Sequence, residues 1–325
     1  MKKLFIKSAC ILSALLCYTA IQTVKAQPVA PKESSPLTIL KALNPSTVTL
    51  KDSASFDIKD QKSNQTYRIF ISIPDAPPPA SGYPVVFVMD GNALFNTTRD
   101  ALRAYEKRVD LTKKIHPVIV GIGYLPSDNM AQLRTYDLTP PQNTKIPMKY
   151  KTGGAEAFAS FIQDQLKPLI TRYVPIDQQH QALMGHSFGG LFTVYNFVYH
   201  PNEYQVYVAA SPSLWLDPVL ISNRINYLEQ QKVTFAKNPK TILLTVGSYE
   251  QNIAPYWQNN PNLEKIKHHL AAKHQVDHIH QACKGLKQVS DVVVDCVDFD
   301  GEDHSSVVPA AIGRGVAVIM RAFAQ

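Results

Sequence analysis

The sequence predicts an α/β fold: a single domain with a mostly parallel, doubly wound sheet and helices on both of its faces. Short apolar runs alternate along the chain with longer segments whose apolar residues recur every three or four positions, which is typical of βα units. The 325 residues are enough for one large domain. In addition, a serine flanked by glycines stands between one such strand and one such helix.

Residues 1–26 have the pattern of a secretory signal peptide. Three lysines open the chain, and the mostly apolar stretch from Ala9 to Ile21 is too short to span a bilayer. Val24-Lys25-Ala26 then matches a small-x-small cleavage site, so we expect cleavage before Gln27. An uncleaved anchor is the alternative. We favour an exported, periplasmic protein without a stable membrane anchor.

Removing this segment changes both the charge and the cysteine content. The whole chain has 33 basic and 26 acidic side chains, but four lysines leave with residues 1–26, so the net charge falls from +7 to +3. Such a mild balance does not suggest nucleic-acid binding, which needs a clustered basic face. Cys283 and Cys296 remain in an oxidising setting. A disulfide between them and two separate thiols are both compatible with the sequence.

The Pro- and Ser-containing residues 27–46 indicate an N-terminal arm, which leaves residues 47–325 for the catalytic domain. Strands are expected over Ser53–Ile58 and Thr66–Ile73, paired as a hairpin, and over Tyr83–Met89, His116–Gly123, Ala182–Met184, Gln205–Ala210, Thr241–Val246 and Asp291–Phe299. Helices are expected over Asp100–Val109, Phe158–Ile170, Leu191–Tyr199, Asn262–Lys273 and Val307–Phe323. Residues 124–150 show no clear period and indicate a long loop.

The strongest functional signal is Gly185-His186-Ser187-Phe188-Gly189, extended by Gly190. A buried strand precedes it and a helix follows it, so Ser187 stands at the apex of a sharp turn. Such a turn needs small residues around the serine, strains its backbone and exposes its hydroxyl. This context is that of the nucleophile elbow of the α/β-hydrolase fold. A glycine-rich turn that holds a structural serine is the alternative.

A serine at its free pKa is a weak nucleophile and needs a base. In this fold the partners follow the serine in the order acid, histidine, so His304, after the last strand, is the expected base. A surface histidine in an acidic turn is the alternative. Glu250, after the preceding strand, is the first candidate for the acid. Asp217, Glu302 and Asp303 compete with it, and a Ser–His dyad is also open.

The oxyanion hole is expected to use backbone N–H groups. One comes from Phe188, the residue after the serine, and the second from Gly91-Asn92, in the turn after the third strand. The alternative for Asn92 is that it only closes that turn. Like the other candidate groups, these residues follow the carboxyl ends of strands, where ligands bind in such sheets.

Four side chains are candidates for binding substrate. Arg134 is suited to a carboxylate or an electron-rich ring, Tyr136 and Trp215 are suited to stacking on aromatic groups, and His186 lies beside the serine. A structural ion pair, with Asp137 or elsewhere, is the alternative for Arg134. For Trp215 the alternative is packing in the core.

Five histidines crowd residues 268–280, and histidine is a common metal ligand. The segment has no HExxH pattern and no matching carboxylate pair, so a solvated helix and loop is the favoured interpretation. We therefore expect neither a metal nor a cofactor, and a small-molecule ester as the partner.

Several segments resemble the putative esterase family of α/β hydrolases, which includes esterase D, bacterial siderophore esterases and mycolyltransferases. They are Gly121-Ile-Gly-Tyr124, Arg134-Thr-Tyr-Asp-Leu-Thr-Pro140, Gly153-Gly-Ala-Glu-Ala-Phe158 and Met184-Gly-His-Ser-Phe-Gly-Gly190. Asp90-Gly-Asn92, Ser211-Pro-Ser-Leu-Trp215 and the export signal add a likeness to periplasmic hydrolases of enterobactin-type trilactones. The resemblance runs from about Ser53 to the C-terminus.

The resemblance implies hydrolysis of a catecholate siderophore macrolactone, ferric or iron-free, with Ser187 as nucleophile and His304 as base. It also implies that Arg134 and Trp215 help to hold an anionic aromatic ligand. Some members of the subgroup work without a triad acid, which leaves the role of Glu250 open. A general carboxylesterase, an acyltransferase and a non-enzymatic binding protein of the same fold are the alternatives.

Overall fold

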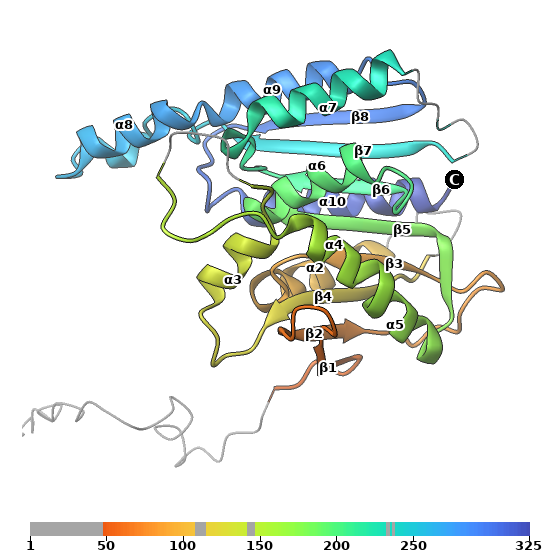
Figure 1. Ribbon diagram of the computed structural model, residues 1–325. Coiled ribbons are helices and arrows are strands. Elements are labelled where there is room, and N and C mark those ends of the chain that lie inside the picture. The colour runs from red at the N-terminus through yellow and green to blue at the C-terminus, as the bar shows by residue number, and fades with distance from the viewer. Residues whose placement is uncertain (1–47, 108–114, 142–146, 232–234, 236–237) are drawn as a thin grey trace, which may run out of the picture. The chain divides into compact units, whose positions relative to one another are not determined.

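An eight-stranded sheet with the order β1-β2-β4-β3-β5-β6-β7-β8 organises the chain (Figure 1). β1, β2 and β4 pair in antiparallel fashion, and every neighbouring pair from β4 to β8 is parallel. The computed structural model describes residues 48–107, 115–141, 147–231, 235 and 238–325. Within it, Leu50–Gln325 form one compact unit. The expected signal peptide (1–26) and arm (27–46) lie outside the described residues.

Each strand expected from the sequence is present. The strands are β1 (Ser53–Lys59), β2 (Thr66–Ser72), β3 (Tyr83–Val88), β4 (Val118–Tyr124), β5 (Ile176–His186), β6 (Val206–Ala210), β7 (Lys240–Gly247) and β8 (Val292–Phe299). β5 starts earlier than predicted because its first half is polar and partly exposed, so that it lacks the apolar signal of a buried strand.

Helices cover both faces of the sheet, as predicted. They are α2 (Gly91–Glu106), α3 (Met130–Asp137), α4 (Ala155–Phe161), α5 (Lys167–Tyr173), α6 (Phe188–Tyr199), α7 (Pro218–Gln230), α8 (Leu263–Lys273), α9 (Gln275–Leu286) and α10 (Val308–Phe323). A π-helical turn, η2 (Ile162–Leu166), joins α4 to α5, and two short 3-10 helices are η3 (Leu214–Leu216) and η4 (Pro255–Trp257). Among the described residues, no helix is both long and apolar enough to cross a membrane.

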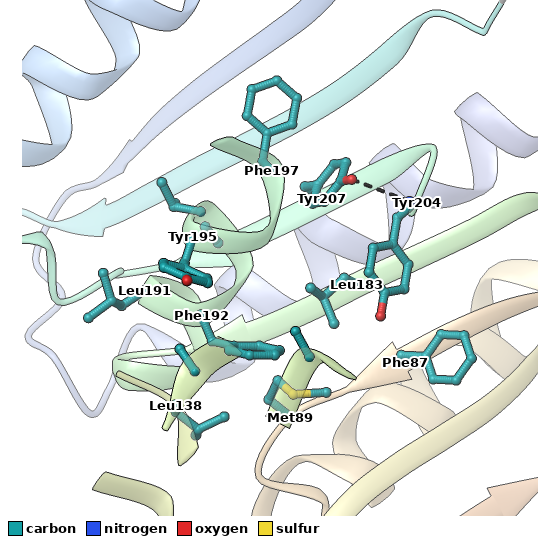
Figure 2. Packing of buried hydrophobic residues seen from close by; sticks show 14 of the residues in the cluster. Phe87, Met89, Leu138, Leu183, Leu191, Phe192, Tyr195, Phe197, Tyr204 and Tyr207 are labelled. Carbon is teal, nitrogen blue, oxygen red and sulfur yellow. Dashed lines mark hydrogen bonds between the residues drawn. The ribbon is translucent and has the colours of Figure 1, made fainter. Parts of the chain in front are cut away.

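Alternate residues of the buried strands pack into two different cores. In β3, Val85 and Phe87 join the core that contains α4, α6, α7 and α9, and Figure 2 shows Phe87 and Phe192 on this side. Val86 and Val88 point to the opposite core, which is formed with α2 and α10. This alternation, with both faces buried, confirms the doubly wound α/β-hydrolase architecture.

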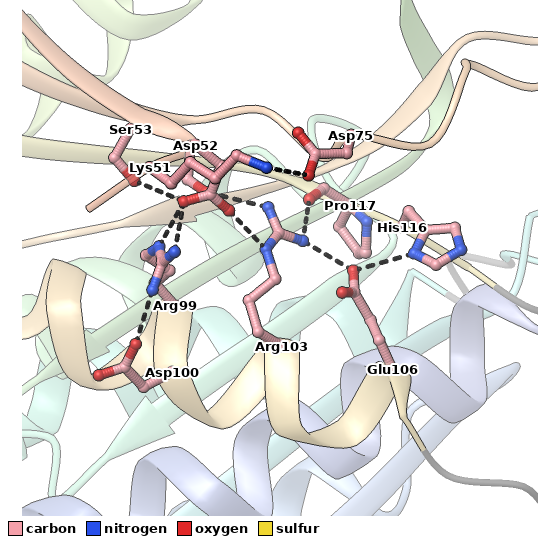
Figure 3. Close-up of polar contacts among 11 residues, drawn as sticks. Lys51, Asp52, Ser53, Asp75, Arg99, Asp100, Arg103, Glu106, His116 and Pro117 are labelled. Carbon is pink, nitrogen blue, oxygen red and sulfur yellow. Dashed lines mark hydrogen bonds and ion pairs between the residues drawn. The ribbon is translucent and has the colours of Figure 1, made fainter. Parts of the chain in front are cut away.

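A polar network fixes α2 against the start of the hairpin (Figure 3). Asp52, just before β1, accepts hydrogen bonds from Arg99 and from Arg103 Nε at 3.0 Å, and Arg103 also pairs with Glu106 at 2.7 Å. Burial alone would raise the pKa of Asp52, but the two guanidinium groups hold it well below its usual range. The network matters for the site because α2 begins at the carboxyl end of β3.

Two predictions for the first half of the chain were wrong. α2 begins at Gly91 and not at Asp100, because burial of Leu94 and Phe95 outweighs the turn preference of the residues after Asp90. Residues 124–150 are not a loop throughout, since α3 lies within them. Its start is stabilised by Asn129, whose side chain accepts the Gln132 N–H at 3.2 Å.

Two helices in the second half were missed. α7 has a recognisable start, because Asp217 caps it and Pro218 occupies its first turn. α9 follows α8 after a single residue, His274, which has φ 45°. Its histidines and lysine concealed an amphipathic helix that buries Ile279 and Leu286.

Candidate active site

The turn between β5 and α6 has the geometry of a nucleophile elbow. Ser187 at its apex has φ 60° and ψ −117°, which is a strained conformation for a residue with a side chain. A Cβ on Gly185 would lie 2.3 Å from the backbone of Gly189, so only glycine allows the turn to close. The structure therefore confirms the strained backbone that the sequence predicts at Ser187 and the need for a small residue at position 185.

Ser187, His304 and Glu250 form a continuous hydrogen-bonded chain. The Oγ of Ser187 lies 3.0 Å from Nε2 of His304, and Nδ1 of His304 lies 2.6 Å from Oε2 of Glu250. The three residues follow β5, β8 and β7, whose carboxyl ends meet at one edge of the sheet. This arrangement allows the imidazole to accept the serine proton while the carboxylate fixes its tautomer.

The three competing carboxyl groups have other partners or positions. Asp217 caps α7 by accepting the Leu220 N–H at 2.9 Å, and Asp303 accepts the hydroxyl of Tyr256 at 2.6 Å. Glu302 contributes its backbone carbonyl, which accepts an N–H from the turn after β7 at 2.9 Å. Glu250 is therefore the acid that the fold brings to the histidine.

Glu250 is buried and held by several donors. It accepts hydrogen bonds from the hydroxyl of Ser211 at 2.5 Å, from the Gly247 N–H at 2.8 Å and from Nε2 of Gln275 at 3.3 Å. Burial by itself would raise the pKa of Glu250, but the hydrogen bond and charge of His304, together with the donors Ser211 and Gly247, lower it below its ordinary value. The group is thus a carboxylate at neutral pH, suited to stabilise an imidazolium.

His186 supports the segment that carries His304. Its Nε2–H donates to the carbonyl of His304 at 2.9 Å, and the two ring centroids are 4.6 Å apart. Burial, and then the charge of His304, lower the pKa of His186 to about 4, so its ring is neutral at physiological pH. His186, predicted as a substrate contact, also lines a cavity beside the elbow.

The loop after β6 supplies two serines to the site. In the sequence they contribute only to the family resemblance, within Ser211-Pro-Ser-Leu-Trp215, and no separate role was predicted for either. Ser211, with φ 43°, contacts Glu250, while Oγ of Ser213 lies 3.3 Å from Oγ of Ser187. The backbone N–H of Ser213 also donates to the carbonyl of Ser187 at 3.1 Å. Their position at the carboxyl end of a strand was the available signal. Gln275 had no such signal, because it lies on the missed helix α9.

The predicted oxyanion donors lie at two helix starts. Phe188 is the first residue of α6, and Gly91 and Asn92 are the first two residues of α2. Backbone N–H groups in a first helical turn lack acceptors within the helix, and the helix dipole adds to their attraction for an anion. The two starts are close together. Gly189 is the second residue of α6 and Asp90 directly precedes α2, and a Cβ added to Gly189 would lie 3.4 Å from Oδ2 of Asp90.

The side chain of Asn92 has a structural task. Its Oδ1 accepts the Tyr124 N–H at 2.7 Å and its Nδ2 donates to the Tyr124 carbonyl at 3.0 Å. This pairing joins α2 to the end of β4, so only the backbone N–H of Asn92 is suited to an oxyanion. Asn92 therefore does not simply close a turn, which was the alternative.

Arg134 forms a two-point ion pair with Asp90, with Nε and Nη2 each 2.8 Å from a carboxylate oxygen. The ion-pair alternative therefore holds, although Asp137 is not the partner and instead accepts the Tyr67 hydroxyl at 3.2 Å. The guanidinium carbon also lies 5.3 Å from the centroid of the Phe188 ring. Arg134 thus fixes α3 to the two helix starts, with its charge already balanced.

The two aromatic candidates lie differently. Trp215 is 7% exposed and its ring centroid is 6.1 Å from that of Phe188, so it packs mainly in the core beside the elbow. Nζ of Lys273 lies over the Trp215 ring at 4.6 Å. Tyr136 is 37% exposed and packs against Gly154 at the start of α4.

The cysteine pair and the histidine-rich segment meet around α9. Cys283 and Cys296 form a disulfide that joins α9 to β8, and His280 of α9 pairs with Asp298 at 2.9 Å. Over the described residues, no group of three or more His, Cys, Asp or Glu side chains is placed to hold a metal ion.

The sheet order and the elbow define the chain as an α/β hydrolase. A family model described as putative esterase matches residues 61–290, and the chain belongs to this family. It is 33% identical over 267 residues to the ferri-bacillibactin esterase BesA of Bacillus subtilis, covering 80% of this chain and 86% of that protein. It is 29% identical over 285 residues to the siderophore triacetylfusarinine C esterase of Aspergillus fumigatus, covering 84% and 95%.

Solved structures of similar proteins have the same fold. The BES protein from Bacillus cereus has a TM-score of 0.71 and 30% identity, with 85% of this chain and 97% of that chain covered. Siderophore hydrolase EstB from Aspergillus nidulans has a TM-score of 0.73 and 25% identity, with 85% and 96% covered. The chain is a carboxylic ester hydrolase.

Proposed function

We propose that the chain is an exported serine esterase that hydrolyses ester bonds of a catecholate siderophore macrolactone through an acyl-enzyme. The observation that carries the proposal is the unbroken hydrogen-bonded chain from Ser187 through His304 to Glu250 at the carboxyl edge of the sheet. Nucleophile, base and orienting acid are thereby present in contact and in the order typical of the fold.

In the first half of the proposed reaction, Oγ of Ser187 attacks the ester carbonyl while Nε2 of His304 takes its proton. The carboxylate of Glu250 stabilises the resulting imidazolium. The negative charge on the former carbonyl oxygen is stabilised by the backbone N–H groups of Phe188 and of the first turn of α2. When the tetrahedral intermediate collapses, the C–O bond breaks and His304 returns the proton to the leaving alkoxide.

In the second half, a water molecule attacks the acyl-enzyme. His304 takes a proton from this water as the new C–O bond forms, and the same N–H groups stabilise the second oxyanion. Collapse releases Ser187, which regains its proton from His304, and the carboxylic acid leaves. In a macrolactone the acid and the alcohol belong to one molecule, so the first turnover opens the ring.

The substrate class is supported by the relatives, whose names describe esterases of ferri-bacillibactin and of triacetylfusarinine C. A further relative, 32% identical over 184 residues, is the apo-salmochelin esterase of Escherichia coli O6:H1, with 54% of this chain and 55% of that protein covered. Export is supported by the signal-peptide pattern of residues 1–26 and by the disulfide between Cys283 and Cys296. These features favour the periplasm as the site of action.

The test is the Ser187→Ala variant, assayed with enterobactin and with phenyl acetate. We expect kcat to fall on the order of 10⁶-fold for both esters, because the nucleophile is lost. A fluorophosphonate probe should add its mass to the peptide that contains Ser187 in the wild type, and should add no mass at this position in Ser187→Ala. Ser222→Ala, on α7, is the matched control and should react normally. Undiminished hydrolysis by Ser187→Ala would refute the assignment of the nucleophile.

A further inference from the structure

Helix α8 carries an apolar stripe that the fold covers only in part. Leu263, Ile266 and Leu270 recur at helical spacing, yet no residue of α8 is buried. Figure 1 shows α8 extending beyond the ends of β7 and β8, on the side where the strands finish. Leu263, Ile266 and Leu270 are each half-buried, and apolar surfaces that the fold covers only in part are often binding sites.

Ile266 and Leu270 of this stripe line a groove of about 1080 Å³, which we call the α8 groove. The side chains that matter for its chemistry are Trp257 of η4 and Lys265, Ile266, His268, His269 and Leu270 of α8. The groove is large enough for an aromatic ring system and its linker. An indole and two aliphatic side chains give it an apolar wall.

Two residues adjacent in sequence to the groove lining contact the surroundings of the triad. Tyr256, next to Trp257, is 59% exposed and donates its hydroxyl to Asp303, the neighbour of His304, at 2.6 Å. Lys273 closes α8 and lies over the ring of Trp215, which packs against the elbow. The groove is thus linked to the site through neighbours of its lining residues, which suits a part of the substrate remote from the reacting bond.

The charge of the groove is basic. Lys265, His268 and His269 line it, whereas Glu264, its acidic lining residue, pairs with Lys267 at 2.8 Å. Burial, and then the charges of Lys273 and Lys265, lower the pKa of His269, so its ring is neutral at neutral pH and Lys265 supplies the positive charge of the lining. An apolar wall with a positive rim is complementary to an aromatic ring that carries negative charge.

We propose that the α8 groove is a second binding site for the ester substrate, and that it holds an anionic aromatic arm remote from the bond being cleaved. The proposal rests on the esterase function proposed above and extends it to a substrate with more than one such arm. Binding of the remote arm positions the scissile ester over Ser187 without contributing to the chemistry.

The first experiment measures binding without turnover. Ser187→Ala protein is titrated with 2,3-dihydroxybenzoate, and tryptophan fluorescence is followed, since Trp257 lines the groove and the only other tryptophan is the mostly buried Trp215. We expect saturable quenching that is lost in Trp257→Phe. Lys265→Glu should weaken binding about tenfold, because it reverses a charge on the groove.

Lys287→Glu is the matched control, because it reverses the charge of an exposed lysine at the end of α9, outside the groove lining. It should change the dissociation constant less than about twofold. Equal weakening by both variants, or absence of quenching in the Ser187→Ala parent, would overturn the proposed site.

The second experiment separates this proposal from the esterase function. With the active enzyme, Lys265→Glu and Trp257→Ala should raise KM for enterobactin about tenfold and leave kcat/KM for phenyl acetate unchanged. Unchanged KM for enterobactin in both variants rejects the α8 groove while the esterase stands. Failure of the wild type to cleave either ester rejects the esterase, and the fluorescence result still decides the groove. If Trp257→Ala turns a dimer into a monomer on gel filtration, the groove is a subunit interface and the proposal fails.

Discussion

Glu250 and Asp137 are both buried carboxyl groups near the carboxyl edge of the sheet, and their pKa values shift in opposite directions. Burial raises the pKa of each. At Glu250 the hydrogen bond and charge of His304, with two further donors from Ser211 and Gly247, outweigh burial and lower the pKa. At Asp137 the hydroxyl groups of Tyr67 and Tyr124 do not outweigh it, and the pKa rises to about 7.

The difference lies in the partners and not in the depth of burial. Glu250 is 3% exposed and Asp137 is 6% exposed, so both have lost most of their water. Glu250 faces an imidazole that can become positive, whereas Asp137 has neutral phenols as its hydrogen-bond partners. A buried carboxylate stays charged where a cation or several strong donors replace the water, and otherwise it takes up a proton.

Among changes to these two carboxyl groups, the largest effect should come from Glu250→Gln, which removes the charge of Glu250 but keeps the shape of its side chain. We expect kcat for phenyl acetate to fall on the order of 10³- to 10⁴-fold, because the imidazolium loses its counter-charge and His304 loses its correct tautomer. The measurement is steady-state kinetics at pH 7.5. Glu302→Gln, in the loop that carries His304, is the control and should retain activity. Comparable losses of kcat in both variants would show that the charge of Glu250 has no specific role in catalysis.

Asp137→Asn tests the other member of the pair through stability. With a folded pKa of about 7 and an ordinary value of 3.8, the folded chain holds a proton that the unfolded chain has lost between these pH values. The free energy of unfolding should therefore fall as pH rises through this window, by up to about 4 kcal/mol. The asparagine variant should lack this loss.

Urea unfolding at pH 5 and pH 8 covers the upper part of this window, so the wild type should lose about 2.7 kcal/mol relative to the variant between these two pH values. Asp164→Asn is the control, because Asp164 forms an exposed pair with Lys62 and should change stability little at either pH. If wild type and Asp137→Asn lose stability in parallel, the carboxyl group at 137 is charged throughout the range.

Comparison of the two carboxyl groups also shows what the sequence could predict. Ser187, His304 and Glu250 were accessible because fold order fixes which strand each follows, and the structure brings them together. The partners of Glu250 were less accessible, because Gln275 lies on a helix whose polar residues concealed its apolar face. Local pattern predicts the elements, but it does not predict which side chains meet across them.

Asp137 and Arg134 illustrate the same limit. Their nearness in sequence made an ion pair between them a natural alternative, yet Arg134 pairs with Asp90, 44 residues away. Asp137 instead meets Tyr67 of β2, 70 residues away. Both residues lie on the helix α3, expected as a loop, and their partners come from two other elements, the turn after β3 and the strand β2, which nearness along the chain does not show.

The smallest effect should come from removing one hydroxyl group from each carboxyl group. Ser211→Ala deletes a donor to Glu250, so the pKa of Glu250 should rise and kcat/KM should fall about tenfold, which corresponds to about 1.4 kcal/mol. Tyr67→Phe deletes the corresponding donor to Asp137, a group outside the hydrogen-bonded chain of the site, and should leave kcat/KM unchanged. The pH profile of kcat/KM separates a specific from a general effect, because only Ser211→Ala should move its acidic limb to higher pH. Equal losses in both variants, with no movement of that limb, would mean that the hydroxyl of Ser211 supports the fold and not the charge of Glu250.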